Sequence, residues 1–245
     1  ESKIVPESDN SHVAMAVNLD ACINCNLCVR ACREVQVNDV IGMGNRGHVS
    51  KVIFDFNDPM GDSSCVSCGE CVQACPTGAL MESNLLNENG KKVINPDRKV
   101  DSLCPYCGVG CQLTYNIKDE KIVSVDGREG PANHNRLCVK GRFGFDYVHN
   151  PERITKPLIR KKGIKKDPKE KLDPLNPLSH FREATWEEAL DLAASKLSSI
   201  RDAKGGDDAL AGFGCAKGSN EEAYLFQKLI RVGFRNNNVD HCTRM

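Results

Sequence analysis

Hydrophobic and polar residues alternate along two stretches of the chain, and this period of two is typical of half-buried strands. In residues 40–56 the apolar side chains of Val52, Phe54 and Phe56 follow a turn at 44–47, which predicts a hairpin. Two roles for the hairpin stay open: it packs against a neighbouring domain or subunit, or it decorates the surface.

The second alternating stretch predicts a strand over residues 111–118. Leu113, Tyr115 and Ile117 share one face of this strand, and polar residues share the other. A polar pair then turns the chain, and a second apolar strand returns it. The pattern therefore predicts a small antiparallel sheet.

From residue 183 onward the apolar period lengthens to that of a helix. Thr185 and Glu188 have the spacing of a capping box, and Gly205 with Gly206 ends the predicted helix. Its apolar stripe consists of Trp186, Leu190, Ala193, Leu197 and Ile200.

A short apolar strand is predicted at 209–213, followed by a second helix with Ser219 as N-cap and Glu222 in the capping-box position. Its predicted buried stripe is Ala223, Phe226, Ile230 and Phe234. This β-loop-α order suits an open α/β domain that binds its ligand at the carboxyl end of the strand.

Composition narrows the class of protein. The 245 residues are enough for two or three small domains, and 33 basic residues balance 33 acidic ones. This balance gives no electrostatic reason to expect nucleic acid or an anionic membrane as a partner. The sequence has no apolar run long enough for a membrane span and no signal peptide, so we expect no direct membrane span.

The 14 cysteines change this picture most. Twelve lie between Cys22 and Cys138 in three groups of four, and the first two groups are C-x2-C-x2-C-x3-C runs. In such bacterial iron–sulfur runs each triplet binds one 4Fe–4S cubane, and the fourth cysteine binds the other. The predicted ligands are Cys22, Cys25, Cys28 and Cys75 for the first cluster and Cys65, Cys68, Cys71 and Cys32 for the second. The third group, Cys104, Cys107, Cys111 and Cys138, predicts a third cubane in a different local fold.

Two other interpretations compete with the clusters. Disulfides normally join separate segments, whereas these cysteines are three or four apart in tight loops, so we do not favour them. Zinc also uses C-x2-C pairs, but it gives no reason for two paired runs. Free thiolates imply a reducing compartment, and we expect a cytoplasmic protein.

Three polar or thiol side chains and one basic segment lie outside these groups, and we expect none of them to be a metal ligand. We expect His12 to be solvated and His134 to lie at the surface or behind the third cluster. Cys215 is expected to pack as an isolated thiol. The basic, proline-containing segment 158–182 is expected to be a solvated insertion, with docking of a partner as the alternative.

The motif CPYCGVGC at 104–111, followed by LCVKGRFGFDYV at 137–148, resembles the N-terminal cluster domain of the molybdopterin guanine dinucleotide oxidoreductases. Within that family it most resembles formate dehydrogenase alpha subunits. The two preceding cubane runs are similar to those of cytoplasmic NAD-linked members. The resemblance implies that Lys140 assists electron passage between the third cubane and the pterin. A glycine-containing loop at a helix N-terminus can receive an anion such as a pyrophosphate, so we expect Gly214, Lys217 and Gly218 to contact the pterin.

Pattern and resemblance together predict an α+β chain with five segments. These are an entry segment at 1–18, a ferredoxin-like two-cluster domain at 19–90, a small β-rich 4Fe–4S domain at 97–157, the insertion at 158–182, and the start of an α/β molybdopterin-binding domain at 183–245.

The resemblance implies a formate dehydrogenase, with formate oxidised to CO2 at a molybdenum or tungsten bis-pterin site. Electrons are expected to pass through three 4Fe–4S clusters to a flavin- and NAD-binding iron–sulfur subunit or another redox partner. Nitrate reductase is the rival activity, and a stand-alone electron carrier is the non-enzymatic alternative.

The last residues, NNNVDHCTRM at 236–245, resemble the family segment that precedes the metal-ligating cysteine or selenocysteine. Cys242 does not match the ligand position. We therefore expect the catalytic metal ligand and the remainder of the alpha subunit to lie outside this sequence.

Overall fold

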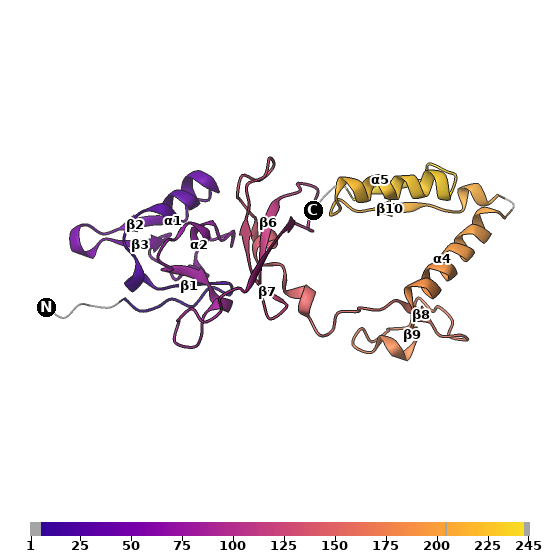
Figure 1. The fold of residues 1–245 in the computed structure, drawn as a ribbon, viewed down its shortest axis with the longest axis horizontal. Coiled ribbons are helices and arrows are strands. Elements are labelled where there is room, and N and C mark those ends of the chain that lie inside the picture. The colour runs from indigo at the N-terminus through magenta and orange to yellow at the C-terminus, as the bar shows by residue number, and fades with distance from the viewer. Residues whose placement is uncertain (1–5, 204, 243–245) are drawn as a thin grey trace. The chain divides into compact units, whose positions relative to one another are not determined.

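The computed structural model describes residues 6–203 and 205–242. The chain forms two compact units, residues 1–146 and 147–245. We call them unit 1 and unit 2 and treat each by itself (Figure 1). The predicted boundaries at 90, 97, 157 and 182 stay predictions.

Two short helices at equivalent places in the two cysteine runs organise the first part of unit 1. α1 (Leu27–Arg30) continues into a wider π turn, Ala31–Val35, and α2 (Glu70–Ala74) contains Cys71 and ends just before Cys75. β1 (Met15–Val17) pairs antiparallel with β4 (Leu80–Glu82). All three residues of β1 are buried, so the entry segment contributes a core strand.

The predicted hairpin is confirmed as β2 (Ile41–Gly44) and β3 (Lys51–Phe54). Val52 and Phe54 are buried in the same hydrophobic core as cysteines of both runs, so the hairpin belongs to this core rather than decorating the surface. The expectation for Phe56 is wrong, because β3 ends at Phe54 and the turn that follows leaves Phe56 97% exposed.

A three-stranded antiparallel sheet follows, in the order β5 (Arg98–Leu103), β6 (Gln112–Lys118) and β7 (Lys121–Gly127). The two predicted strands are confirmed, with a register shift between Asn116 and Ile117. The sequence missed β5, an edge strand whose residues are mostly polar and exposed. Leu113 and Val125 form the core of the sheet with Leu137, just before α3 (Val139–Phe143).

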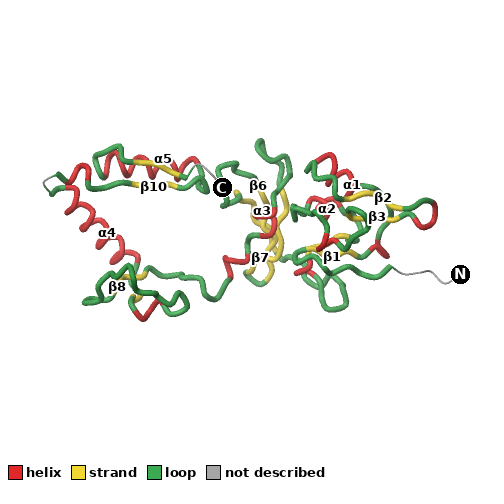
Figure 2. Tube along the Cα trace, turned by 180° about the vertical axis from the view of Figure 1, so that it is seen from behind, coloured by secondary structure: helices red, strands yellow, loops and turns green. Residues whose placement is uncertain are grey.

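Loops and single 3-10 turns join these elements of unit 1, and Figure 2 shows how much of it lies outside helices and strands. The turns of unit 1 are Leu19–Ala21, Gly47–Val49, Met60–Asp62 and Ser83–Leu85.

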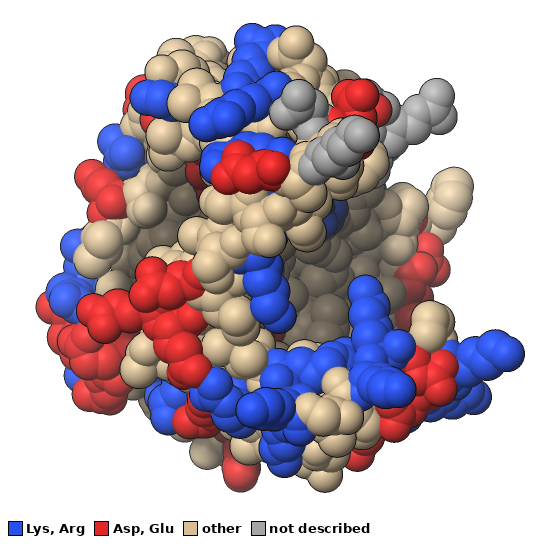
Figure 3. All heavy atoms as spheres, turned by 90° about the vertical axis from the view of Figure 1, so that its right-hand side faces the viewer, with Lys and Arg blue, Asp and Glu red and all other residues tan. Residues whose placement is uncertain are grey.

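Unit 2 begins with a turn, Asp146–His149, which straddles the boundary, and a short antiparallel pair, β8 (Leu158–Arg160) and β9 (Phe181–Glu183). Residues 161–176 between them are exposed, as expected for a solvated insertion, and a 3-10 turn at Pro177–Ser179 follows them. Figure 3 shows Lys and Arg side chains gathered along the lower edge of this face, over the β8–β9 segment.

The first predicted helix of unit 2 is confirmed as α4 (Trp186–Arg201). The Glu188 N–H donates to Thr185 Oγ1 at 3.2 Å, but the Glu188 carboxylate pairs with Arg182 rather than completing a capping box. Trp186 and Leu190 are 66% and 61% exposed. The apolar stripe of α4 therefore is not covered within the described residues.

The second half of unit 2 is a succession of strand, helix and strand that makes one β-α-β unit. β10 (Gly212–Gly214) pairs in parallel with β11 (Val239–His241), and α5 (Asn220–Lys228), extended by a π turn at Leu229–Gly233, connects them. The Ser219–Glu222 capping box is confirmed in both directions. The predicted strand 209–213 starts later, because a 3-10 turn occupies Gly206–Asp208.

The predicted stripe of α5 is only partly confirmed. Ile230 is 1% exposed, whereas Ala223 lies on the exposed side. None of the described helices is both long and apolar enough to cross a membrane.

Candidate iron–sulfur sites

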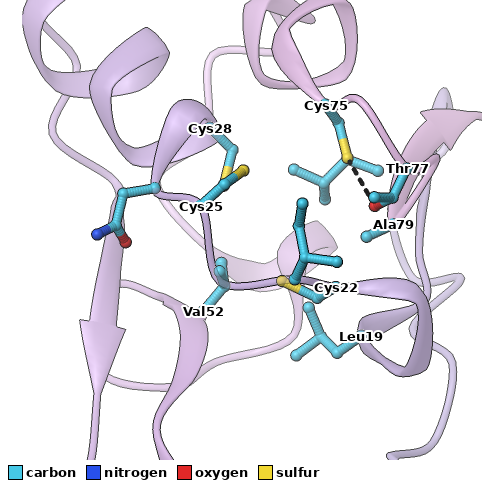
Figure 4. Close-up of a pocket in the computed structure, with 11 residues that line it drawn as sticks. Leu19, Cys22, Cys25, Cys28, Val52, Cys75, Thr77 and Ala79 are labelled. Carbon is cyan, nitrogen blue, oxygen red and sulfur yellow. Dashed lines mark hydrogen bonds between the residues drawn. The ribbon is translucent and has the colours of Figure 1, made fainter.

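The first cysteine site consists of Cys22, Cys25, Cys28 and Cys75, which line one pocket with Leu19, Val52, Thr77 and Ala79 (Figure 4). The first three come from the loop before α1 and from α1 itself, while Cys75 follows α2. The fold thus brings the fourth cysteine of the second run to the first triplet.

The second cysteine site consists of Cys32, Cys65, Cys68 and Cys71, which line a second pocket with Val40 and Ile41 of the hairpin. Cys32 arrives from the π turn that extends α1, so the exchange of fourth cysteines is reciprocal. The structure therefore brings together the two predicted sets of four cysteines.

The two loops that carry the triplets have the same backbone geometry at equivalent positions. Asn24 and Ser67 occupy equivalent positions and both have positive φ, 53° and 57°. Each donates its N–H to the sulfur two residues earlier, Asn24 to Cys22 at 3.4 Å and Ser67 to Cys65 at 3.3 Å. The left-handed backbone turns the amide toward the sulfur, and asparagine tolerates this conformation better than most residues.

Burial and backbone amides act differently on the thiols. Burial raises the pKa of Cys28 to about 11 and raises that of the fully buried Cys71 well above its usual range. Burial also pushes the pKa of Cys75 upward, but hydrogen bonds from the backbone of Leu80, Thr77 and Ala79 outweigh it and the pKa is lowered. A buried thiol is best used as a deprotonated metal ligand, because the metal supplies the compensating charge.

The third cysteine site consists of Cys104, Cys107, Cys111 and Cys138, beside the small sheet. The Cys104 N–H donates to the Cys111 carbonyl at 2.9 Å, and both side chains pack against the sheet's core. Burial raises the pKa of Cys104, and the charges of Cys138 and Cys107 raise it further. Cys138 is exposed and immediately precedes α3.

Donor chemistry at all three sites fits 4Fe–4S clusters. The described residues include all 14 cysteines, and every one is free. They contain no group of three or more His, Cys, Asp or Glu gathered around a single ion position. A cubane accepts a wider cage, since each thiolate binds a different iron, and its sulfurs are stabilised by N–H donors such as those of Asn24 and Ser67.

Arg142, the last residue of the C-x-K-G-R motif, connects the second and third sites. It is 1% exposed and pairs with Glu70 of α2. Its Nε–H donates to the Cys68 carbonyl at 2.7 Å, and its Nη1 donates to the Gln73 side chain at 2.8 Å. This role of Arg142 was not predicted from the sequence, although its position four residues after Cys138 was a usable signal.

Gly69 makes room for this arginine. Its φ is +74°, a conformation that side chains with a Cβ rarely adopt, and an added Cβ would lie 2.1 Å from Arg142 Cδ. Three further contacts fasten the same regions: the Leu137 N–H donates to Glu70, Gln36 donates to the Leu137 carbonyl, and the Gly127 N–H donates to Gln73.

The prediction that His12 is a solvated side chain is wrong. It is 8% exposed rather than solvated. The Ala14 N–H donates to His12 Nδ1 at 3.1 Å, so Nε2 carries the proton of the neutral ring and donates to Ser67 Oγ at 2.9 Å. Ser67 lies between Cys65 and Cys68, so this histidine supports the loop of the second site. The segment between His12 and β1 gave no periodic signal that could have revealed it.

The remaining predicted residues lie on the surface. His134 pairs with Glu129 at 3.0 Å, in agreement with a surface role. Lys140 is exposed on α3, and Lys217 is exposed in the loop between β10 and α5, flanked there by Gly214 and Gly218. The expectation for Cys215 is wrong: it is exposed and has a thiol neighbour.

Comparison with known proteins matches three consecutive regions of the chain. The profile of the "4Fe-4S dicluster domain" matches residues 21–79, that of the "Molybdopterin oxidoreductase Fe4S4 domain" matches 97–150, and that of "Molybdopterin oxidoreductase" matches 153–245. The chain is thus an iron–sulfur protein with two consecutive cluster domains. It belongs to the molybdopterin oxidoreductase family.

Two curated relatives match most of the chain. "Probable oxidoreductase YjgC" of Bacillus subtilis is 37% identical over 96% of this chain and 26% of its own length. "Putative formate dehydrogenase SH0748" of Staphylococcus haemolyticus is 36% identical over 92% of this chain and 25% of its own length. The chain therefore spans about a quarter of the length of these relatives.

Among solved structures, the crystal structure of an NAD+-reducing NiFe hydrogenase in the H2-reduced state is 26% identical and covers 36% of each chain, with a TM-score of 0.31.

Proposed function

We propose that this chain is the electron-transfer portion of a formate dehydrogenase. The observation that carries the proposal is the exchange of Cys32 and Cys75 between the two cysteine runs, together with the relatives named as formate dehydrogenases. A paired arrangement of this kind serves two cubanes close to each other, and two adjacent cubanes have a use in passing electrons.

Each of the three cysteine sites would hold one 4Fe–4S cluster, with the ligands named for it above. When bound, these clusters supply one-electron storage and transfer. The residues of the chain hold them, donate N–H bonds to their sulfurs, and exclude water from Cys28 and Cys71. Arg142 fixes α3, and with it the third site, against the second site.

Lys140 would assist passage of electrons between the third site and the pterin. Its exposed position on α3, two residues after Cys138, leaves it free to face another part of the full protein. Gly214, Lys217 and Gly218 would contact a molybdopterin guanine dinucleotide that carries molybdenum or tungsten. Their loop joins the carboxyl end of β10 to the amino end of α5, where α/β domains bind anionic ligands.

The electron acceptor would be a flavin- and NAD-binding iron–sulfur subunit in the cytoplasm. Nitrate reductase is the second candidate activity, because the cluster motifs resemble a family that includes both activities.

The purified chain tests the cluster part of this proposal. We expect about twelve iron atoms per chain after anaerobic reconstitution, and about four fewer in Cys107→Ser. If Cys107→Ser retained all its iron, the assignment of the third site would be wrong.

The gene's full-length product tests the activity. We expect formate to reduce the clusters and NAD in the presence of the partner subunit. Oxidation of the reduced clusters by nitrate, without reduction by formate, would favour the second candidate. A full-length preparation without pterin would support an electron carrier instead.

A further inference from the structure

Two cysteines outside the three sites meet just beyond the parallel strands of unit 2. Gly214 of β10 and His241 of β11 are the last paired residues of the ladder. The next residues are Cys215 and Cys242, and the Cys242 thiol donates to Cys215 Sγ at a sulfur–sulfur distance of 4.0 Å. The two thiols are 27 residues apart in the sequence, so it is the fold that brings them together.

Backbone amides and a lysine surround this pair. The Ala216 N–H donates to Cys242 Sγ at 3.2 Å, and the Lys217 N–H donates to Cys215 Sγ at 3.4 Å. The first of these bonds, with the bond to Cys215 and the charge of Lys217, lowers the pKa of Cys242. Both thiols are exposed in the described part of the chain, so a small reagent can reach them.

The backbone geometry suits a covalent bond. Neighbouring strands lie about 4.7–4.9 Å apart, which falls within the 4.4–6.8 Å Cα separation typical of disulfides. The two sulfurs have to approach from 4.0 Å to about 2.05 Å, a change that rotation about the side-chain bonds can supply.

We propose that Cys215 and Cys242 form a reversible disulfide, made by exchange with a low-molecular-weight disulfide such as oxidised glutathione. The Cys242 thiolate attacks one sulfur of the small disulfide, forms a mixed disulfide and releases one thiolate. Cys215 then loses its proton, attacks the Cys242 sulfur and releases the second thiolate. Two electrons pass from the cysteine pair to the small disulfide, which is reduced to two thiols.

The bond would tie the loop that carries Lys217 to the end of β11. In the reduced state the contacts of the two thiols and of Ala216 connect this loop to the residue after β11. Oxidation would therefore restrict how far the loop can open. The disulfide itself does not depend on the function proposed above.

Peptide mapping tests the proposal directly. The reduced chain with its clusters intact is treated anaerobically with oxidised glutathione, quenched in acid with an alkylating reagent, and digested with trypsin without reduction. Cleavage after Lys204, Lys217, Arg235 and Arg244 gives the peptides 205–217 and 236–244, one for each cysteine. We expect these two peptides to be linked in the wild-type chain.

Two variants and an unfolded control make the result decisive. Cys215→Ser is expected to accumulate glutathione on Cys242, and Cys242→Ser to give no linked peptide. Unfolding the chain in urea before treatment should lower the linked yield about tenfold, because the pair then has to close a long flexible loop. A stable glutathione adduct on Cys242 of the wild-type chain, or equal linkage in urea, would overturn the proposal.

Discussion

Arg142 and Glu70 form an ion pair inside unit 1, with side chains that are 1% and 8% exposed. The arginine belongs to α3, next to the third cysteine site, and the glutamate to α2, next to the second. Glu70 also accepts the Leu137 N–H at 3.1 Å. One carboxylate therefore holds the chain on both sides of Cys138, through Leu137 before it and Arg142 after it.

Replacing Arg142 by leucine is expected to lower the free energy of unfolding of unit 1 by about 3–5 kcal/mol, because it leaves the Glu70 carboxylate buried without its partner. Chemical denaturation of the cluster-loaded chain measures this. Arg98→Leu is the matched control, since Arg98 pairs with Glu120 at the surface and an exposed pair contributes about 0–1 kcal/mol. Equal losses in the two variants would contradict a structural role for the buried pair.

The exchange of fourth cysteines predicts which variants resemble each other. Cys75→Ser should lose the same cluster signal in electron paramagnetic resonance as Cys22→Ser, and Cys32→Ser the same signal as Cys65→Ser. Each variant should also contain about four fewer iron atoms or a three-iron remnant of the affected cluster. If Cys75→Ser instead resembled Cys65→Ser, each run would hold its own cluster and the crossed assignment would fail.

His12 predicts a pH dependence of stability. Burial lowers its pKa below the ordinary 6.5, only partly offset by the charge of Asp9. As the pH falls below 6.5 the unfolded chain binds a proton that folded His12 resists, so the contribution is complete above 6.5 and is lost as the pH falls through the lowered pKa.

His12→Asn should therefore reduce the loss of unfolding free energy between about pH 7 and pH 5.5, measured against the wild-type chain. Asparagine keeps an acceptor for the Ala14 N–H, and it removes the titrating ring. His48→Asn, at an exposed position, is the control and should follow the wild-type chain. Parallel pH profiles of His12→Asn and the wild-type chain would show that His12 does not contribute in this way.

Asn133 predicts a specific defect at the third site. Its side chain is 5% exposed; its Oδ1 accepts the Gln112 N–H, and its Nδ2 lies within hydrogen-bond distance of the carbonyls of Gln112, Arg128 and Arg136. It thus attaches the loop before Cys138 to β6.

Asn133→Ala is expected to destabilise unit 1 by about 3 kcal/mol, because it leaves buried backbone groups unpaired. The same variant should lose iron from the third site before the other two, as followed by iron content after mild chelation. Asn95→Ala, at an exposed position ahead of β5, should behave like the wild-type chain. Simultaneous loss from all three sites would mean that Asn133 supports unit 1 as a whole.

Local patterns predicted the local structure well. The hairpin around the turn at 44–47, the β6–β7 pair and the two helices of unit 2 are confirmed because spacing, turn residues and caps act within a few residues of each other. β5 was missed because an edge strand with polar, exposed residues carries no apolar alternation. The apolar pattern continued to Phe56, but the strand ends before it and leaves this side chain exposed. Ala223 follows the helical pattern of α5, but it lies on the exposed face of that helix.

Contacts between residues far apart in the sequence were not predicted. His12, Arg142 and the Cys215–Cys242 pair are examples. His12 lies beside Ser67, 55 residues away, and Arg142 lies beside Glu70, 72 residues away. No periodicity in the sequence connects residues so far apart, because their contact depends on how separate elements pack.

The sequence by itself determined the chemistry of this protein. The spacing of its cysteines sets which thiols lie together in each run, since three cysteines in a tight loop stay close wherever that loop lies. The tertiary structure decided what surrounds those thiols: a buried histidine behind the second site, a buried arginine between the second and third, and a second pair of thiols at the end of β10 and β11. These depend on burial and on the meeting of distant segments, and both arise only when the chain packs.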